Sequence, residues 1–274
     1  MTTFVRLLLL AGLCSRLAPG LLMARTCPEG SAGTTVVYLN GIRTDPTAAQ
    51  EDAAVLEARL RALLDSSAKA SECVSSKVAT NNTAGAVEDL WQSFKQRLGQ
   101  NPAQFFDFLA AIDSAPDWFQ TQFRNLSAAL DEAVAAPELM ANVKLYETQM
   151  RTNTVIVVAH SQGNLYANAE YRELRRRGHP LPDRKLFRIV AVATPATVVE
   201  GDGPQHTTVL GDFIYLVPGA LGPTTTNRPE HSDGHSLQKY YLIPGSRSNS
   251  KIVVNIYGSV AGFVGECYGT TSPS

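Results

Sequence analysis

The sequence predicts an α/β protein with a mostly parallel central sheet and helices on both of its faces. Three observations lead to this fold class. Apolar runs without alternation stand at 36–39, 154–158 and 188–195, as in strands that are buried on both faces. Helical patterns at 46–67 and 164–178 separate these runs. Strands that alternate with helices in this way pair in parallel.

The first strand and the helix after it have the clearest boundaries. After the run at 36–39, Asp45 is a good N-cap residue and Pro46 suits the first helical position. Leucines then recur at intervals of three and four and form one apolar face, made of Leu56, Leu60, Leu63 and Leu64. We expect a shorter strand at 75–82 and a late strand at 207–218.

Between about 85 and 150 the sequence predicts helices and no strand, with interruptions at Pro102, Pro116 and Pro137. We expect an all-helical insertion that forms a cap before the strand at 154–158. It holds a group of large aromatic residues: Trp91, Phe94, Phe105, Phe106, Phe108, Trp118, Phe119 and Phe123.

The first 24 residues have the pattern of a secretory signal peptide, with Arg6 before a short apolar run and no acidic residue. An apolar N-terminal helix is the alternative. A cleaved signal predicts a secreted or periplasmic protein whose single domain is 25–274. Three cysteines then remain, Cys27, Cys73 and Cys267, which allow one disulfide bridge without fixing which two residues pair.

The composition sets limits on the partners. The formal net charge is only −1 over 274 residues, and 44% of the residues are hydrophobic. A protein that binds a polyanion needs a basic surface, so we expect no nucleic-acid partner. The hydrophobic content is enough for one full core.

The segment Ala159 to Gly163, "AHSQG", places a serine between a buried strand and a helix. A sharp strand-to-helix turn exposes the hydroxyl of Ser161 at the edge of the sheet, and the backbone N–H of Gln162 faces the same space. Small residues are needed where such a turn folds back on itself, which explains Gly163. The helix N-terminus favours negative charge that develops near Ser161.

These residues resemble the nucleophile elbow of the α/β-hydrolases, Gly-x-Ser-x-Gly, with Ala159 in place of the first glycine. The resemblance implies a minimal α/β-hydrolase-like sheet. It also implies that the backbone of Gly41 and Ile42 joins Gln162 in an oxyanion hole, because "LNGI" follows the first strand, and that Asn40 lies in the substrate site.

The same resemblance extends to the later residues of a catalytic triad. The segment "LGDFIYLVPG" is similar to a region of the fungal lipase-like hydrolases whose aspartate orients the catalytic histidine, which gives that role to Asp212. The loop "DGHSLQKYYL" falls where the family has its histidine and makes His235 the base. The chain order Ser, Asp, His agrees with the family.

Competing assignments remain open at this point. His206 and His231 compete with His235, and Asp202 and Asp233 compete with Asp212. A zinc triplet from the loop "HSDGH" is a further alternative, although the elbow needs no metal, and we expect neither a metal nor a cofactor.

The resemblance implies a serine hydrolase that cleaves a carboxylic ester through an acyl-enzyme intermediate. The alternatives are an acyltransferase with the same triad and a non-catalytic binding protein of the same fold. A small-molecule or lipid ester is the expected partner, and a lipid ester brings transient contact with a lipid surface. Phe105 and Phe106 cannot both face inward on one helix, so they are candidates for an apolar lid over Ser161; the alternative is that these aromatics are core.

Overall fold

The computed structural model covers the 274-residue chain. The parts that it describes are residues 33–40, 46–64, 73–79, 96–98, 104, 108, 114–122, 124, 137–179, 181, 186–201, 206–210, 212, 214, 220–224, 235–242, 256–260 and 262–264. The predicted signal peptide, the predicted cap residue Asp45, and Cys27 and Cys267 lie outside these residues.

A five-stranded parallel sheet is the centre of the described structure. Its strands are β1 (Gly33–Leu39), β2 (Val74–Ala79), β3 (Asn153–His160), β4 (Phe187–Val192) and β5 (His206–Thr207). They lie in the order β2-β1-β3-β4-β5, and every neighbouring pair is parallel. The α/β class and the parallel sheet that the sequence predicts are therefore confirmed.

Position in the sheet explains the sequence of each strand. In β1 every residue is buried, and so are seven consecutive residues of β3 from Thr154 to His160, as expected for central strands with layers on both faces. In β2, by contrast, the four residues between Val74 and Ala79 are exposed or half-buried. This strand is at the edge of the order, so polar side chains are tolerated there.

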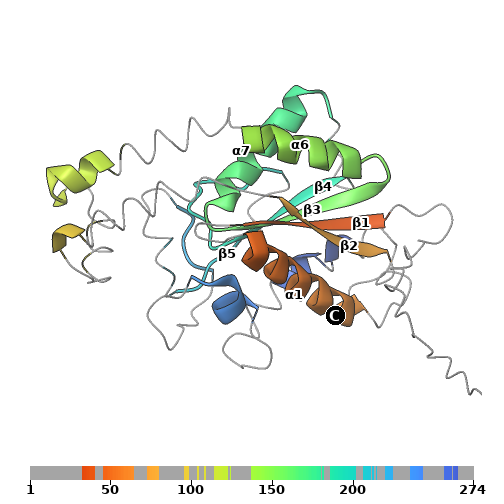
Figure 1. The fold of residues 1–274 in the computed structure, drawn as a ribbon, viewed down its shortest axis with the longest axis horizontal. Coiled ribbons are helices and arrows are strands. Elements are labelled where there is room, and N and C mark those ends of the chain that lie inside the picture. Colours follow the sequence, from red (N-terminus) through yellow and green to blue (C-terminus); the bar gives the residue numbers. More distant parts are fainter. Residues whose placement is uncertain are drawn as a thin grey trace, which may run out of the picture.

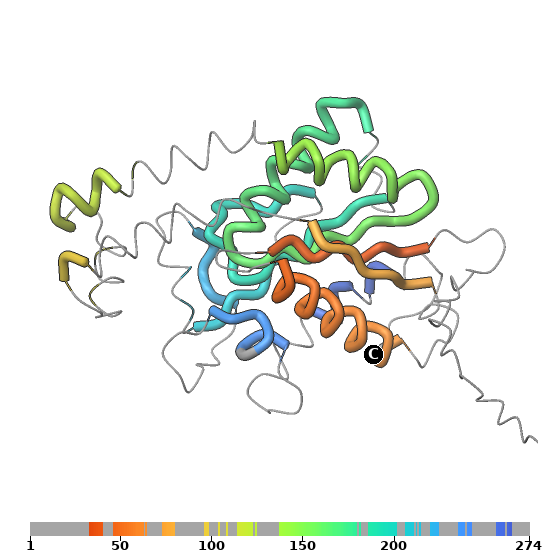
Figure 2. Tube along the Cα trace, viewed as in Figure 1, coloured from red at the N-terminus to blue at the C-terminus, as the bar shows by residue number. Residues whose placement is uncertain are grey.

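Helices cover both faces of the sheet (Figure 1). On one face lies α1 (Pro46–Leu64), which begins at the predicted proline and buries Leu56 and Leu60. The helical stretches 256–260 and 262–264 lie on the α1 side in Figure 2 and supply five residues to the same core cluster: Ile256, Tyr257, Val260, Phe263 and Val264. The other face carries α6 (Pro137–Gln149) and α7 (Gly163–Arg176).

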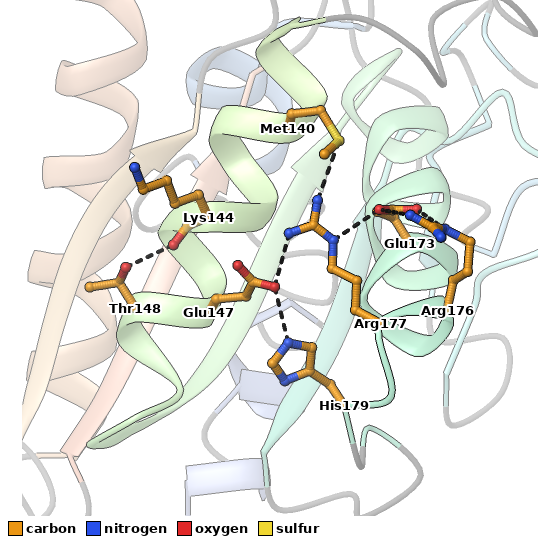
Figure 3. Close-up of polar contacts among 8 residues, drawn as sticks. All are labelled: Met140, Lys144, Glu147, Thr148, Glu173, Arg176, Arg177 and His179. Atoms are coloured by element: carbon orange, nitrogen blue, oxygen red, sulfur yellow. Dashed lines mark hydrogen bonds and ion pairs between the residues drawn. The ribbon is translucent and has the colours of Figure 1, made fainter.

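Polar contacts join α6 to α7 at two depths. In the interior, Glu170 of α7 is fully buried and accepts hydrogen bonds from Asn142 Nδ2 and from the Tyr146 hydroxyl, both at 2.8 Å. At the surface, Figure 3 shows Arg177 reaching from the end of α7 to Glu147 of α6 at 3.0 Å. Exposed ion pairs of this kind add little stability, so the buried contacts matter more for this helix pair.

Two predictions about the elements need correction. The helical insertion was expected to reach about residue 150, but α6 packs on β3 and α7 and is part of the layer that covers the sheet. The described residues between 96 and 124 are helical or in turns, as expected. The late strand was expected at 207–218, but among the described residues only His206 and Thr207 pair with β4, because the chain turns between Val209 and Asp212.

Within the described residues, no helix combines the length and the apolar character that crossing a lipid bilayer requires.

Candidate active site

The turn after β3 holds Ser161 in an uncommon backbone conformation. Its φ is 56°, in the left-handed region that residues with a side chain adopt at a cost of about 1–2 kcal/mol. The next residue, Gln162, is already α-helical and is the N-cap of α7. The chain thus reverses from strand to helix within one residue, and the Ser161 hydroxyl leaves the sheet at its carboxyl edge.

Gly163 lets this turn pack against the end of β1. A Cβ atom at this position would lie 2.6 Å from the carbonyl oxygen of Leu39 and 2.8 Å from that of Asn40. Both contacts are with backbone, which cannot swing away as a side chain does. The steric requirement that the sequence predicts for Gly163 is therefore present.

Asn164 and the end of β4 fix the turn from the other side. The backbone N–H of Ser161 donates to the Val192 carbonyl at 3.0 Å. The Asn164 Nδ2 donates both to that carbonyl, at 2.9 Å, and to the carbonyl of Ser161, at 2.8 Å. With these bonds made inside a buried region, the backbone position of Ser161 is defined by β3, β4 and α7 together.

Three residues that are distant in sequence meet at this turn. His235 Nε2 lies 2.7 Å from Ser161 Oγ, and His235 Nδ1 lies 2.9 and 3.0 Å from the two carboxylate oxygens of Asp212. The sequence predicts an exposed Ser161 hydroxyl, but Ser161 is fully buried, as is Asp212, while the His235 side chain is 17% exposed. An ionised carboxylate only accepts hydrogen bonds, so the proton of neutral His235 is on Nδ1, and Nε2 accepts from the serine hydroxyl.

The Asp212 carboxylate has two donors besides His235. The backbone N–H of Ile214 donates to Oδ1 at 2.9 Å, and the Tyr241 hydroxyl donates to Oδ2 at 2.6 Å. Burial and the nearby Asp212 charge raise the pKa of Tyr241 well above its ordinary value, so this hydroxyl keeps its proton. Both oxygens of a fully buried carboxylate are thus paired, which offsets the cost of burying its charge.

His160 contacts the histidine segment from the strand side. Its Nε2 lies 2.8 Å from the backbone carbonyl oxygen of His235, and the two imidazole rings are 5.0 Å apart. Burial, together with the neighbouring His235, lowers the pKa of His160 to about 3. His160 is therefore neutral near pH 7 and adds no positive charge beside His235.

The other residues predicted for the site are described only in part. As the N-cap residue, Gln162 has a backbone N–H without an acceptor in α7, as an oxyanion-hole donor requires. Its buried side-chain amide makes no hydrogen bond to the described part of the chain. Asn40 is buried at the end of β1, where its carbonyl faces Gly163. Gly41 and Ile42 lie outside the described residues.

Of the competing histidines, His206 is engaged elsewhere. Its Nε2 bonds to the carbonyl oxygen of Gly222 at 3.0 Å, whereas the ring that faces Ser161 is that of His235. The other competitors, His231, Asp202 and Asp233, fall in segments that the structure leaves undescribed. Among the side chains that it describes, no group of three or more His, Cys, Asp or Glu is placed to hold a metal ion.

The predicted lid residues Phe105 and Phe106 also fall outside the described segments, as do Trp91, Phe94 and Phe123. The aromatics of this region that are described pack on one another. Phe119 is fully buried, and its ring is 5.3 Å from that of Phe108 and 5.5 Å from that of Trp118, both edge to face. For these three residues the packing agrees with the core alternative, and the lid stays a prediction.

Sequence reasoning missed Tyr241 and the contact that His160 makes. The loop "DGHSLQKYYL" contains Tyr240 and Tyr241, and a tyrosine in a buried segment usually finds a partner for its hydroxyl. That rule could have flagged Tyr241 without naming its acceptor.

The arrangement is able to activate a serine. A hydroxyl within hydrogen-bond reach of a neutral imidazole, which a buried carboxylate orients, is the geometry that nucleophilic catalysis needs. Comparison of the chain with models of protein families, with curated proteins and with solved structures found no match.

Proposed function

We propose that this protein is a serine hydrolase that cleaves a carboxylic ester through an acyl-enzyme intermediate. The observation that carries the proposal is the chain of contacts Ser161 Oγ to His235 Nε2 at 2.7 Å and His235 Nδ1 to Asp212 at 2.9 Å. A buried serine with a left-handed backbone and a histidine on its hydroxyl has no evident purpose in folding alone.

In the first half-reaction, Ser161 Oγ attacks the ester carbonyl carbon while His235 Nε2 takes the hydroxyl proton. Asp212 fixes the imidazole through Nδ1 and stabilises the positive charge that His235 acquires. The carbonyl oxygen becomes negative, and the N–H of Gln162 and the start of α7 lie beside Ser161 to stabilise it. The alcohol then leaves with the proton from His235 Nε2.

In the second half-reaction, water takes the place of the alcohol. His235 removes one proton from the water, the hydroxide attacks the acyl carbon, and Ser161 Oγ leaves with that proton. The products are a carboxylic acid and the free enzyme, so atoms and charges balance without any cofactor. An acyl acceptor other than water would make the same site a transferase.

An α/β-hydrolase-like scaffold is the second part of the proposal. Its support is the parallel sheet, the serine at a strand-to-helix turn on the central strand β3, and an aspartate and a histidine that follow in this order beyond β4. Ligand sites in open parallel sheets lie at the carboxyl ends of the strands, where Ser161 stands.

The test is covalent labelling with a fluorophosphonate, followed by peptide mapping. We expect the wild-type protein to be labelled at Ser161 and Ser161→Ala to be unlabelled with an unchanged melting temperature. Ser236→Ala, one residue from His235, is a control that should still be labelled. Labelling of Ser161→Ala equal to that of wild type would contradict the proposal, and absence of labelling in wild type would favour the non-catalytic binding protein.

A further inference from the structure

The hydroxyl of Tyr241 joins the two ends of the turn that carries Asp212. It donates to Asp212 Oδ2 at 2.6 Å and accepts from the backbone N–H of Val209 at 3.3 Å. The same turn is closed by a hydrogen bond from the Asp212 N–H to the Val209 carbonyl at 3.1 Å. One phenol oxygen therefore fixes both the start of this turn and the carboxylate at its end.

We propose that Tyr241 is a positioning residue of this site, whose hydroxyl holds the Asp212 carboxylate in the orientation that His235 requires. The inference rests on the proposed function, because it assigns a role within the Ser161, His235 and Asp212 arrangement. The Tyr241 hydroxyl bonds to Asp212 and to the Val209 backbone, so its effect on Ser161 and His235 passes through Asp212.

The geometry around Asp212 explains why one donor matters. His235 Nδ1 is almost equally distant from the two carboxylate oxygens, at 2.9 and 3.0 Å, so this contact alone does not fix the rotation of the carboxylate. The Ile214 N–H donates to Oδ1 and the Tyr241 hydroxyl donates to Oδ2, so each oxygen is held by a separate donor. Asp212 is fully buried, so water is not at hand to replace a lost donor.

The segment after His235 is shaped so that Tyr241 reaches the same carboxylate. Residues Leu237–Tyr241 form a π-helical turn, closed by a hydrogen bond from the Leu242 N–H to the Leu237 carbonyl at 2.9 Å. π-Helical turns are rare in proteins, and those that occur are often located at functional sites. His235 and Tyr241 thus approach Asp212 from the two ends of one short segment.

The side chain of Tyr241 is also held in place. It is fully buried in the core cluster on the α1 face, and its ring lies 6.0 Å from that of His160. Its raised pKa keeps the hydroxyl protonated, so it remains a donor to the carboxylate at neutral and mildly alkaline pH. A rigid, protonated phenol is well suited to orient a charged partner.

The experiment compares Tyr241→Phe with Tyr146→Phe. Both changes remove a buried tyrosine hydroxyl that donates to a fully buried carboxylate, but Tyr146 donates to Glu170 between α6 and α7. The Tyr146 ring packs on Phe187, at the opposite end of the strands from Ser161. Tyr146→Phe thus removes the same kind of buried hydroxyl as Tyr241→Phe, at a position away from Ser161, His235 and Asp212.

For Tyr241→Phe we expect kcat for p-nitrophenyl acetate to fall about 10- to 100-fold with KM nearly unchanged. The ¹H NMR signal of the His235 Nδ1 proton should also shift or broaden, because the Asp212 acceptor is less fixed. Tyr146→Phe should lower the melting temperature but leave kcat and the Nδ1 signal as in wild type. A folded Tyr241→Phe with wild-type kcat and an unchanged Nδ1 signal would overturn the inference.

The inference about Tyr241 remains testable if the variant does not fold or if the wild type shows no activity. If Tyr241→Phe does not fold, 3-fluorotyrosine at position 241 keeps the hydroxyl and makes it more acidic, and an unchanged Nδ1 signal then counts against the inference. If wild type neither hydrolyses the ester nor reacts with a fluorophosphonate, the proposed function fails. The Nδ1 signal still decides the Tyr241 inference, because that measurement does not depend on turnover.

Discussion

His160 Nε2 lies 2.8 Å from the backbone carbonyl oxygen of His235, so the residue just before the serine holds the segment that carries the histidine. A carbonyl oxygen only accepts, which means that Nε2 of His160 carries the proton of the neutral ring. With its pKa lowered to about 3, His160 does not become charged in the pH range where an esterase assay is run.

The first prediction concerns this contact. His160→Leu removes the hydrogen bond to the His235 carbonyl that holds this segment beside Ser161, so we expect a fall in kcat of about tenfold with little change in KM. His160→Gln places an amide N–H near the position of Nε2 and should recover most of the lost activity. The measurement is steady-state ester hydrolysis on both variants, with His179→Gln as a control on a surface histidine.

The pH dependence sharpens this test. Because His160 stays neutral, the acid limb of the rate profile should be the same in His160→Gln and in wild type. If the acid limb of the pH–rate profile shifts in His160→Gln, His160 itself changes protonation in the pH range of the assay. Equal rates for the leucine and glutamine variants would show that its donor is unimportant.

The second prediction is that Gly163→Ala destabilises the protein. The added Cβ would meet the Leu39 carbonyl oxygen at 2.6 Å, so either the turn at Ser161 or the end of β1 must move. Forced packing of this kind costs about 1–3 kcal/mol, and a shift of the turn should also lower the rate at which a fluorophosphonate labels Ser161. Urea denaturation and labelling kinetics measure the two effects.

Gly222→Ala is the matched control for that substitution. A Cβ at Gly222 has no atom within 4 Å, so we expect a change in unfolding free energy of less than about 0.5 kcal/mol and normal labelling. If the two glycine variants behave alike, close packing of the turn after β3 against β1 is not what makes Gly163 necessary.

The sheet and the strand-to-helix turn at Ser161 were predictable because both leave local patterns in the sequence. The runs in β1, β3 and β4 are apolar without alternation since both faces of these strands are covered, and Pro46 marks the start of α1. The sequence around Ser161 carries its own turn and steric requirements. Such signals depend on neighbours within a few residues.

The rest depends on contacts between distant residues. The run at 207–218 has strand composition, yet of its described residues only Thr207 pairs with β4, beside His206, because the chain turns between Val209 and Asp212. Tyr241 donates a hydrogen bond to Asp212, which is 29 residues away in the sequence, and no local sequence pattern predicts that contact. For α6 a signal was present, since Leu139, Val143 and Tyr146 form a buried face that could have assigned this helix to the sheet.

The buried Glu170 gives the last prediction, which concerns stability. Burial raises its pKa in the folded protein from 4.5 to about 7, although Asn142 and Tyr146 donate to it. A raised folded pKa means that the protonated form favours folding. This contribution is complete below pH 4.5 and is lost as the pH rises to about 7, which corresponds to about 3 kcal/mol.

We therefore expect the wild-type unfolding free energy to decrease from pH 4.5 to pH 7.5 relative to that of Glu170→Gln, whose amide keeps an acceptor and cannot ionise. Urea denaturation at several pH values measures this difference. Glu173→Gln is the control on the exposed side of α7, where Arg176 and Arg177 lower the carboxyl pKa to about 2. Because Glu173 is already ionised in the folded protein throughout this range, Glu173→Gln should show the wild-type dependence of unfolding free energy on pH. If wild type and Glu170→Gln instead show parallel curves, Glu170 does not take up a proton on folding.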